Sequence, residues 1–249
     1  MTLASAYDFS SLARVLGCTP KQLGYYLHKR PLTGQYRNFP IQKKSGGFRL
    51  ISAPATNLKL IQKSIAKELD QLRLFKPCVN GFVAKRNIRR NASAHVGQRF
   101  ILNIDLEDFF GSINFGRVYG MLQKPSYSFA TSVAAAIAKA CTLDDKLPQG
   151  APTSPILSNL ICTKMDAELS RFAAANRCNY SRYADDLTFS TRRPVMPFAS
   201  AIKDAEGVTI YELDATLRAV IEQNGFRINE KKVRLRDLTA RQEVTGLIV

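Results

Sequence analysis

The chain has 249 residues with a formal net charge of +16, and its 45% hydrophobic content is enough for a buried core divided among two or three lobes. Five cysteines without a CxxC spacing and only two histidines exclude a disulfide framework and a zinc cluster. Because no apolar run approaches the roughly 18 residues of a membrane span and the N-terminus lacks the features of a signal peptide, we expect a cytoplasmic protein.

Two short helices are predicted within the first 30 residues. Apolar residues recur at helical spacing in 12–16 and again in 23–27, around Gly17 and Pro20. The stretch resembles a helix-turn-helix, so a DNA-binding regulator is one candidate. A helical pair that packs on the next lobe is the other, and it is favoured because no second basic helix face is present. Residues 1–35 are therefore predicted to form an N-terminal helical extension.

A basic β-hairpin is predicted next. The sequence FPIQKKSGGFRLISAP has β-type residues on both sides of Ser45-Gly46-Gly47, with Lys43, Lys44 and Arg49 on the arms. A helix with one apolar stripe follows over 58–72, and its lysines share the solvent side. A loop then leads into a short helix before residue 95.

Positive charge is concentrated in this part of the chain. Residues 21–100 contain 17 Lys and Arg residues, against only Glu68 and Asp70. A surface that serves solubility alone normally mixes both signs. So one-sided a segment favours contact with a polyanion, because phosphates attract Lys and Arg. Solubility is the alternative explanation.

The second half of the chain has a different character. FILNIDLEDFF is predicted as an apolar strand that ends on acidic residues. Helices are predicted over 128–142 and from Ser154-Pro155 towards Ala175, where serine caps the helix and proline opens it. NYSRYADDLTFST indicates two strands bent at residues 184–186. A further helix ends at Asn224-Gly225, and we expect KVRLRDL and EVTGLIV to form a closing hairpin.

Three aspartates need explanation together. Asp105 ends an apolar strand, and Asp185 and Asp186 lie at the tip of an apolar hairpin. Two aspartates in a turn are usually only a turn, because Asp tolerates that backbone geometry. Carboxylates brought together beside apolar neighbours, however, repel unless a cation lies between them. Carboxylates and substrate phosphates are the ligands that Mg²⁺ accepts.

Several motifs occur in the order in which reverse transcriptases carry them. They are the strand IDLEDFFGSI, the loop LPQGAPTSPILSNL, the hairpin YADD, the helix end GFRINEKKVRL and the final VTGLIV. From about Ile41 to Val249 the chain therefore resembles a reverse transcriptase. The motif NAxxH, which begins at Asn91, and VTG, which begins at Val244, resemble those of the retron reverse transcriptases of bacteria.

This resemblance implies an α+β right-hand polymerase with fingers and palm, in which an antiparallel palm sheet carries the aspartates. Residues 36–99 are expected to form basic fingers, and residues 100–249 the palm, with further fingers elements at about 115–150. The family usually continues into a helical thumb after the final motif. Because this chain ends at Val249, we expect the thumb to be missing or truncated.

The resemblance also assigns the catalytic roles. Asp105 and Asp185 are expected to bind metal directly, Asp186 to support the site and bind metal during turnover, and the Leu106 carbonyl to add a ligand. The expected cofactor is Mg²⁺, bound as two ions, with Mn²⁺ as a substitute. Lys232 lies in an NxxK pattern and is a candidate for protonating the leaving pyrophosphate, and an ordinary surface lysine is the alternative.

Residues expected to bind the incoming deoxynucleotide come from several motifs: Lys43, Lys44, Arg49, Phe110, Gln149, Gly150 and Tyr183. Arg49, with either Lys43 or Lys44, matches the finger residues that grip the triphosphate. Fixed cationic donors suit that role. The resemblance leaves open which of the two lysines takes part.

The other nucleotide-binding candidates surround the sugar and base. Phe110 matches the family's steric gate, whose ring clashes with a 2′-hydroxyl and so selects deoxynucleotides, whereas Phe109 is interpreted as core. Gln149 and Gly150 match a loop that contacts the nucleotide and lets the template approach, since glycine has no side chain to block it. Tyr183 is expected to shape the floor beneath the primer terminus.

RNA contacts are expected from the arginine-rich loop. Arg86, Arg89 and Arg90 are interpreted as contacts to the backbone of a template or structured RNA, with Asn91 helping by hydrogen bonding. His95 is interpreted as a structural residue, because a lone histidine near a helix usually is one.

The retron resemblance implies a particular partner and product. Template and primer would belong to one folded noncoding RNA, priming would start from an internal 2′-hydroxyl, and the product would be a branched RNA–DNA hybrid that serves antiphage defence with an effector protein. One alternative is a group II intron-like or other defence-associated reverse transcriptase. Another is a non-catalytic nucleic-acid-binding protein, against which the intact aspartates argue.

Overall fold

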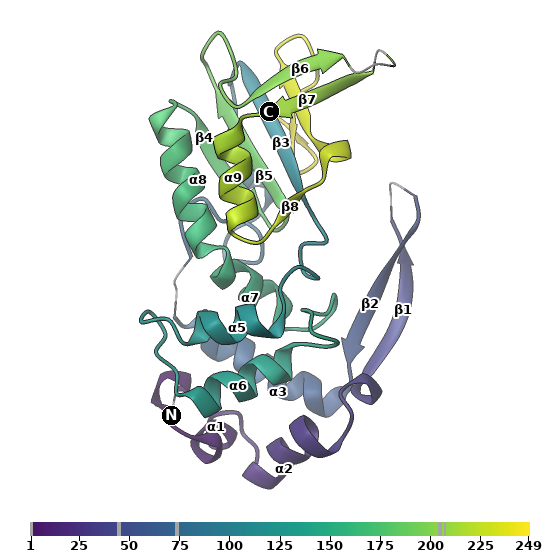
Figure 1. Cartoon of the computed structure of the whole chain (residues 1–249), viewed down its shortest axis with the longest axis vertical. Coiled ribbons are helices and arrows are strands. Elements are labelled where there is room, and N and C mark those ends of the chain that lie inside the picture. Colours follow the sequence, from purple (N-terminus) through teal and green to yellow (C-terminus); the bar gives the residue numbers. More distant parts are fainter. Residues whose placement is uncertain (1, 44–45, 73–74, 204–205, 207) are drawn as a thin grey trace. The chain divides into compact units, whose positions relative to one another are not determined.

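The structure, a computed structural model, describes residues 2–43, 46–72, 75–203, 206 and 208–249. They fall into two compact units (Figure 1). The helical unit comprises the described residues of Met1–Arg73 and Phe110–Ile161, and the sheet unit those of Leu74–Phe109 and Cys162–Val249. In this division residues 75–99 belong with the sheet unit, and the predicted boundaries of fingers and palm stay predictions.

The helical unit is built mainly from short helices. Its elements are α1 Phe9–Val15, α2 Pro20–Gly24, a π-helical turn Tyr25–Lys29, β1 Tyr36–Gln42, β2 Phe48–Pro54, α3 Thr56–Asp70, α5 Phe115–Leu122, α6 Thr131–Cys141 and α7 Ser154–Ile161. Helix α6 is largely buried and packs against α1, α3 and α5. The predicted pair of N-terminal helices and the helix before residue 72 are confirmed, whereas α5 had not been predicted.

The predicted hairpin is also present. Strands β1 and β2 pair antiparallel from Tyr36 opposite Pro54 to Gln42 opposite Phe48. Burial is confined to the Pro54 end, because the residues from Phe48 to Leu50 are all exposed. Lys43 and Arg49 are exposed as well. Lys44 and Ser45 lie outside the described residues.

The sheet unit combines an antiparallel sheet with three helices. Its elements are α4 Ile88–Ser93, β3 Phe100–Glu107, α8 Thr163–Ala175, β4 Asn179–Tyr183, β5 Asp186–Thr191, β6 Ala199–Lys203, β7 Thr209–Leu213, α9 Ala215–Gln223, β8 Arg227–Ile228, a 3₁₀ turn Glu230–Lys232, β9 Arg234–Asp237, β10 Glu243–Val244 and β11 Leu247–Ile248. Figure 1 shows α8 and α9 side by side over one face of the sheet. No helix of the described part of the chain is long and apolar enough to cross a membrane.

Strand β3 is the centre of the sheet. One edge of β3 pairs with β5, which pairs in turn with β4, and the other edge pairs with β9 and β8. Because side chains alternate along a strand, β3 directs Leu102 and Ile104 to one face and Asn103 and Asp105 to the other. The first face is apolar and lies against α8 and α9, whereas the second carries polar residues and faces α4 and the β10–β11 hairpin.

Two details of the predicted elements were wrong. The closing hairpin of KVRLRDL with EVTGLIV does not form, because β9 pairs with β3 and β10 pairs with β11. The local reason is a two-residue turn at Thr245 and Gly246, whose φ angles of 47° and 83° let the VTGLIV segment fold back on itself. The helix from Ser154 towards Ala175 is interrupted at Cys162, which separates α7 from α8.

Candidate active site

Two strands of the sheet unit bring the three predicted aspartates together. Asp105 on β3 lies directly opposite Asp186, the first residue of β5. Tyr183 pairs with Asp186, so Ala184 and Asp185 form a two-residue turn between β4 and β5. The backbone amide of Leu106 donates to the carbonyl of Asp185 at 3.0 Å, which fixes this turn to the central strand. The sequence-based expectation that these carboxylates share one site agrees with this register.

The turn adopts an uncommon backbone conformation. Ala184 has a φ of 58°, in the left-handed region that residues with a side chain rarely occupy. Such a conformation persists only where the surroundings hold it. The carboxylates of Asp185 and Asp186 are therefore carried by a turn that depends on its neighbours for its shape.

Asp186 has a raised pKa in this site. Desolvation by the surrounding protein, followed by the charges of Asp185 and Asp105, raises the pKa of Asp186 to about 7, and Lys232 opposes the shift. Asp105 is mostly buried and has two fixed partners. The Lys232 ammonium lies 2.9 Å from its Oδ2, and the Asn229 amide donates to its Oδ1 at 3.1 Å. Repulsion of this kind is relieved when a cation binds.

The donor set suits a hard divalent cation that is completed by substrate. Within the described residues, no group of three His, Cys, Asp or Glu side chains forms a metal cage by itself. Mg²⁺ usually takes only one or two carboxylates from the protein and fills its shell with phosphates and water. Asp105 and Asp185, the expected direct ligands, and Asp186, which repels them, fit such a partial site. The reverse transcriptase family generally uses divalent metal ions.

The NxxK pattern supplies residues that orient Asp105. Asn229 precedes the 3₁₀ turn Glu230–Lys232 and Lys232 ends it, and the backbone N–H of Asn229 also donates to the backbone carbonyl of Asp105 at 2.9 Å. Lys232 was predicted as a proton donor, and it is the ion-pair partner of Asp105 in this structure. Asn229 was missed as a site residue, although it begins the same pattern.

The remaining residues predicted at the nucleotide belong to two units. Tyr183 lies in the sheet unit beside the turn, and Leu106, predicted as a metal ligand through its carbonyl, follows Asp105 on β3. Phe109 is buried and stacks on Phe226 with ring centroids 5.6 Å apart, which confirms its interpretation as core. Phe110 is half-buried and lies in the helical unit.

Gln149 and Gly150 pack against the hairpin strand that carries Arg49. The amide of Ser52 on β2 donates to the Gln149 carbonyl at 2.7 Å. At Gly150, which has a φ of +119°, a Cβ would lie 2.8 Å from Ile51 Cγ2. Only glycine fits this approach without a shift of the strand. Within the helical unit the loop and the basic strand are thus one packed assembly.

A cavity of about 690 Å³ adjoins Asp186 on the polar face of the sheet. Asn103 and Thr188 form part of its floor, and the Thr188 hydroxyl donates to Asn103 Oδ1 at 3.1 Å. Its walls come from β9 and the β10–β11 region, with three arginines and the VTG turn: Arg234, Arg236, Arg241, Thr245 and Gly246. Glu243 also lines the cavity and forms an ion pair with Arg241 at 3.7 Å. The sequence had indicated the VTG motif but not that it lines an arginine-containing cavity next to the carboxylates.

The predicted RNA-binding residues separate into exposed and buried groups. Arg89 and Arg90 are exposed on α4. The Arg86 guanidinium donates to the carbonyls of Lys76 and Val79, so it ties two loop segments together. Asn91 is fully buried, and its Oδ1 accepts from Asn80 at 3.0 Å. The side chain of Asn91 therefore supports the fold beneath the arginines and does not present a group to solvent, and its contact with RNA stays a prediction.

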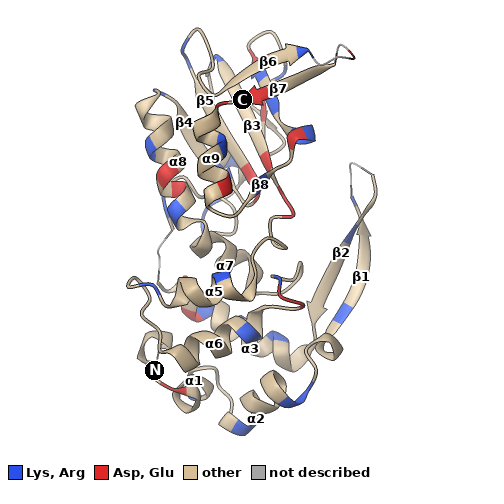
Figure 2. Ribbon diagram, in the orientation of Figure 1, with Lys and Arg blue, Asp and Glu red and all other residues tan. Residues whose placement is uncertain are grey.

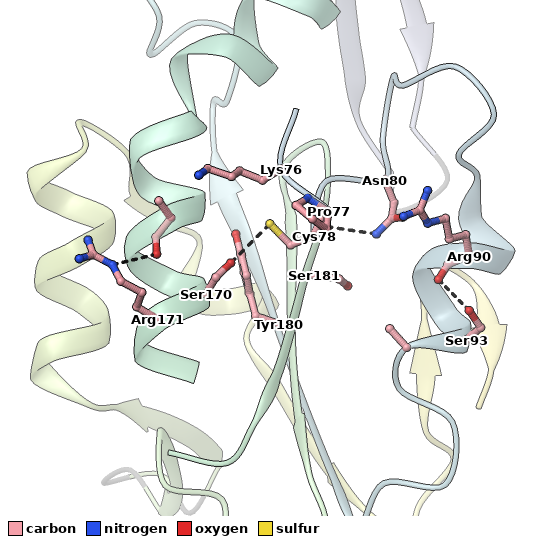
Figure 3. Close-up of a pocket in the computed structure, with 12 residues that line it drawn as sticks. Lys76, Pro77, Cys78, Asn80, Arg90, Ser93, Ser170, Arg171, Tyr180 and Ser181 are labelled. Atoms are coloured by element: carbon pink, nitrogen blue, oxygen red, sulfur yellow. Dashed lines mark hydrogen bonds between the residues drawn. The ribbon is translucent and has the colours of Figure 1, made fainter. Parts of the chain in front are cut away.

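A second cavity of the sheet unit, of about 820 Å³, lies between α4, α8 and β4. Figure 3 shows Lys76, Arg90 and Arg171 on three sides of it, with Cys78 and Tyr180 between them. No acidic residue within the described part of the chain lines this cavity. Arg86 is not among the residues that line this cavity, and partial burial, followed by the nearby charge of Arg90, lowers its pKa.

Charge is distributed differently over the two units. Figure 2 shows Lys and Arg along α2, α3 and β1, whereas acidic and basic segments are intermixed over the sheet unit. The basic residues of α2, α3 and β1 belong to the helical unit, and the residues that line the two cavities belong to the sheet unit.

Two buried polar clusters were not recognised as site elements from the sequence. The Arg182 guanidinium forms a bidentate pair with Asp166 at 2.7 and 2.8 Å, and both side chains are completely buried. The Tyr180 hydroxyl donates to the same carboxylate at 2.9 Å. His95, buried as expected for a structural residue, bridges β4 and β5 through serine hydroxyls that lie 2.7 Å from each ring nitrogen.

Comparisons with known proteins identify the family that these motifs suggested. A family model described as "Reverse transcriptase (RNA-dependent DNA polymerase)" matches residues 41–245. Retron Mx65 reverse transcriptase of Myxococcus xanthus is 34% identical over 96% of this chain and 57% of its own length. Retron Ec86 reverse transcriptase of Escherichia coli is 33% identical over 98% of this chain and 70% of its own. The chain thus spans little more than half of the Myxococcus relative.

Solved structures share the fold at low sequence identity. The apo telomerase from Candida Tropicalis, truncated from its C-terminal domain, superposes with a TM-score of 0.55 at 13% identity, over 88% of this chain and 54% of that chain. Telomerase from Candida albicans in complex with a TWJ fragment of telomeric RNA superposes with a TM-score of 0.54 at 12% identity, over 88% and 46%. Together with the family match, they confirm the predicted α+β polymerase fold with fingers, palm and an antiparallel palm sheet.

Proposed function

This chain belongs to the reverse transcriptase family, and we propose that it adds deoxynucleotides to a primer on an RNA template. The single observation that carries the proposal is the register that sets Asp105 opposite Asp186, with Asp185 in the adjoining turn. Burial of Asp186, followed by the charges of Asp185 and Asp105, raises its pKa to about 7, which an exposed turn would not do. A buried carboxylate with a raised pKa beside other carboxylates at strand ends is characteristic of a reaction centre.

We assign the carboxylates to the binding of divalent cations, Mg²⁺ by preference and Mn²⁺ as a substitute. Two bound ions would supply the positive charge that activates the primer 3′-hydroxyl and stabilises the leaving pyrophosphate. Asp105 and Asp185, with the Leu106 carbonyl, would hold them, and Asp186 would join during turnover. Asn229 fixes the orientation of Asp105 by two hydrogen bonds.

Residues of the helical unit are also proposed to bind the nucleotide, on the basis of the family match. Arg49, with Lys43 or Lys44, grips the triphosphate, because exposed cations on a hairpin suit a phosphate chain. Gln149 and Gly150 line the base, supported by their packing on the Arg49 strand.

The sugar and the leaving group have assignments of their own. Phe110 selects the deoxyribose, and Tyr183 supports the primer terminus. We assign Lys232 the role of donating a proton to the leaving pyrophosphate, which the position of its ammonium beside Asp105 supports.

The cavity beside Asp186 fits the end of the primer strand. Its three arginines match the phosphates of a strand whose 3′ end must reach the carboxylates. The second basic cavity fits the backbone of a structured RNA, with Arg89, Arg90, Lys76 and Arg171 as the contacts. The relatives are retron reverse transcriptases. On that basis we propose a cognate noncoding RNA as template and primer, a branched RNA–DNA product, and antiphage defence with an effector protein.

Primer extension tests the polymerase proposal. The wild-type chain, with Mg²⁺, deoxynucleotides and an RNA template annealed to a primer, should extend the primer. Asp185→Asn should reduce the rate by at least about 10³-fold, because the carboxylate is needed at the site of charge development. Asp70→Asn, which removes an exposed acid at the end of α3, is the matched control and should extend normally. Absence of primer extension by the wild-type chain, or an equal amount of product from Asp185→Asn, would contradict the proposal.

Copurified RNA tests the retron assignment. A retron enzyme should bring down one dominant structured transcript, whereas a general reverse transcriptase should bring down a mixture. The triple variant Lys76→Ala, Arg90→Ala and Arg171→Ala should lose that transcript but still extend a short annealed primer. A variant that retains the transcript would exclude the second basic cavity as its binding site.

A further inference from the structure

We propose that a brace formed by the segment Cys78–Gly81 and the buried Asp166–Arg182 pair positions the turn that carries Asp185 and Asp186, and thereby sets the rate of nucleotide addition. The inference rests on the proposed polymerase function. It concerns positioning residues, because neither part of the brace belongs to the carboxylate group itself. Everything it uses lies within the sheet unit.

The segment Cys78–Gly81 extends the sheet beyond β4. Val79 forms a parallel bridge with Arg182. The amide of Arg182 donates to the Cys78 carbonyl at 2.9 Å, and the amide of Asn80 donates to the Arg182 carbonyl at 2.8 Å. The outer edge of β4 is thus paired up to the residue that precedes Tyr183, and the segment leads directly to the turn.

Gly81 is where this segment meets the turn. A Cβ at Gly81 would lie 2.6 Å from the backbone nitrogen of Ala184 and 3.1 Å from the carbonyl carbon of Tyr183. Real Cβ atoms essentially never approach within 3.0 Å, and ordinary contact begins near 3.4 Å. The neighbours are backbone atoms, which cannot rotate away as a flexible side chain would. Any side chain at Gly81 must therefore displace the peptide that leads into Asp185.

Arg182 holds the same turn from its carbonyl side. Its Nη1 donates to the backbone carbonyl of Ala184 at 3.0 Å. The guanidinium cannot swing, because its other nitrogens form the bidentate pair with Asp166, which in turn accepts from Tyr180. A planar, bidentate pair of this kind fixes direction as well as distance. Helix α8, which carries Asp166, thereby fixes the Ala184 carbonyl.

Asn80 connects the brace to α4. Its Nδ2 donates to the Cys78 carbonyl at 3.1 Å and to Asn91 Oδ1 at 3.0 Å, and both asparagines are buried. This connection joins the stretch Val79-Asn80-Gly81 to the NAxxH motif, since the buried amides keep Gly81 against the turn. The left-handed backbone of Ala184 is thus restrained at its nitrogen by Gly81 and at its oxygen by Arg182.

Small displacements at a reacting centre are costly. Restoring ordinary contact would move the Ala184 nitrogen by several tenths of an ångström, and a misplacement of about 1 Å can reduce a rate by about 10²-fold. Gly81→Ala is therefore expected to slow nucleotide addition by about 10-fold to 100-fold. Binding of template and primer should change by less than about twofold, because the basic residues that contact phosphates are untouched.

Single-turnover extension separates positioning from folding. The enzyme is bound to an annealed RNA template and primer, one deoxynucleotide is added, and the amplitude and the rate of the fast phase are read separately. The amplitude reports the fraction of intact complex, and the rate reports the chemistry. Gly81→Ala should keep the amplitude and lose rate. Gly120→Ala is the matched control, because its added Cβ meets nothing within 4 Å and it should keep both.

The outcomes are decisive in each direction. A Gly81→Ala rate within threefold of wild type, or a loss confined to the amplitude, would overturn the inference and leave the proposed function standing. No product from the wild-type chain would overturn both. If Gly81→Ala does not fold, Arg182→Lys is read in the same way, since lysine keeps the charge beside Asp166 but cannot also hold the Ala184 carbonyl. A normal rate there would overturn the inference too.

Discussion

Replacing His95 with glutamine is expected to make the stability of the chain less sensitive to acid. The histidine is completely buried, and burial lowers its pKa from 6.5 to about 4. Its two serine partners can satisfy the neutral ring, which donates through one nitrogen and accepts through the other. Glutamine can also donate and accept but carries no titrating proton.

The size and sign of the effect follow from the pKa shift. Between pH 6.5 and about 4 the unfolded chain binds a proton at His95 that the folded chain does not. Stability therefore falls as the pH falls, and the contribution is complete above pH 6.5. From that shift, the loss relative to pH 7 is about 2 kcal/mol at pH 5 and about 3 kcal/mol at pH 4.

Urea unfolding at pH 7, 6 and 5 measures this contribution. The chain has no tryptophan, so circular dichroism is the suitable signal. The stability difference between wild type and His95→Gln should shrink by about 2 kcal/mol from pH 7 to pH 5. His28→Gln, which replaces the chain's other histidine at an exposed position, should retain most of the wild-type pH dependence. Parallel pH profiles for wild type and His95→Gln would refute the reasoning.

Three further substitutions have defined outcomes. Asp166→Asn should lower the free energy of unfolding by about 3 to 5 kcal/mol in urea, because it leaves the buried Arg182 charge without its partner; a loss below about 1 kcal/mol would contradict this. Gly150→Ala should lower the melting temperature, since its Cβ would lie 2.8 Å from Ile51, and an unchanged melting curve would show that the strand yields. Asn229→Ala should slow primer extension by about tenfold, because a hydrogen bond to charged Asp105 is worth about 1.5 kcal/mol, and an unaltered rate would exclude an orienting role.

Much of the site could be predicted from the sequence because its signals are local. An apolar strand that ends on Asp105 and a strand–turn–strand pattern around Asp185 require only alternation and turn chemistry. Asp166 could not be found in this way. It lies in a helix with charged neighbours, where an aspartate usually faces solvent, and only the folded chain brings Arg182 under that helix. Because Asp166 and Arg182 lie in different elements, their pairing produces no periodic pattern in the sequence.

The wrong closing hairpin has a similar origin. The alternation of residues in β9 predicts a strand but does not predict its partner. In the structure β9 pairs with the edge of β3 opposite β5 instead of with β10. The burial of Asn91 could not be predicted from the sequence for a related reason. An asparagine beside arginines suggests a polar surface. In the folded chain the amide of Asn91 is instead buried against Asn80, eleven residues earlier in the chain. Sequence patterns identified the elements, and tertiary competition decided their neighbours.

The β1–β2 hairpin derives its burial from one end only, and this makes its stability graded along its length. A two-stranded hairpin without a core is marginally stable by itself. Within the hairpin, backbone amides near Phe48 and Arg49 should therefore exchange fastest with deuterium, and those towards Pro54 should exchange more slowly. The hairpin can open from its exposed end near Phe48 while the helical core stays folded. Nucleic acid bound along it would consequently be recorded as slowed exchange at Arg49 and Leu50, even where the melting temperature does not change.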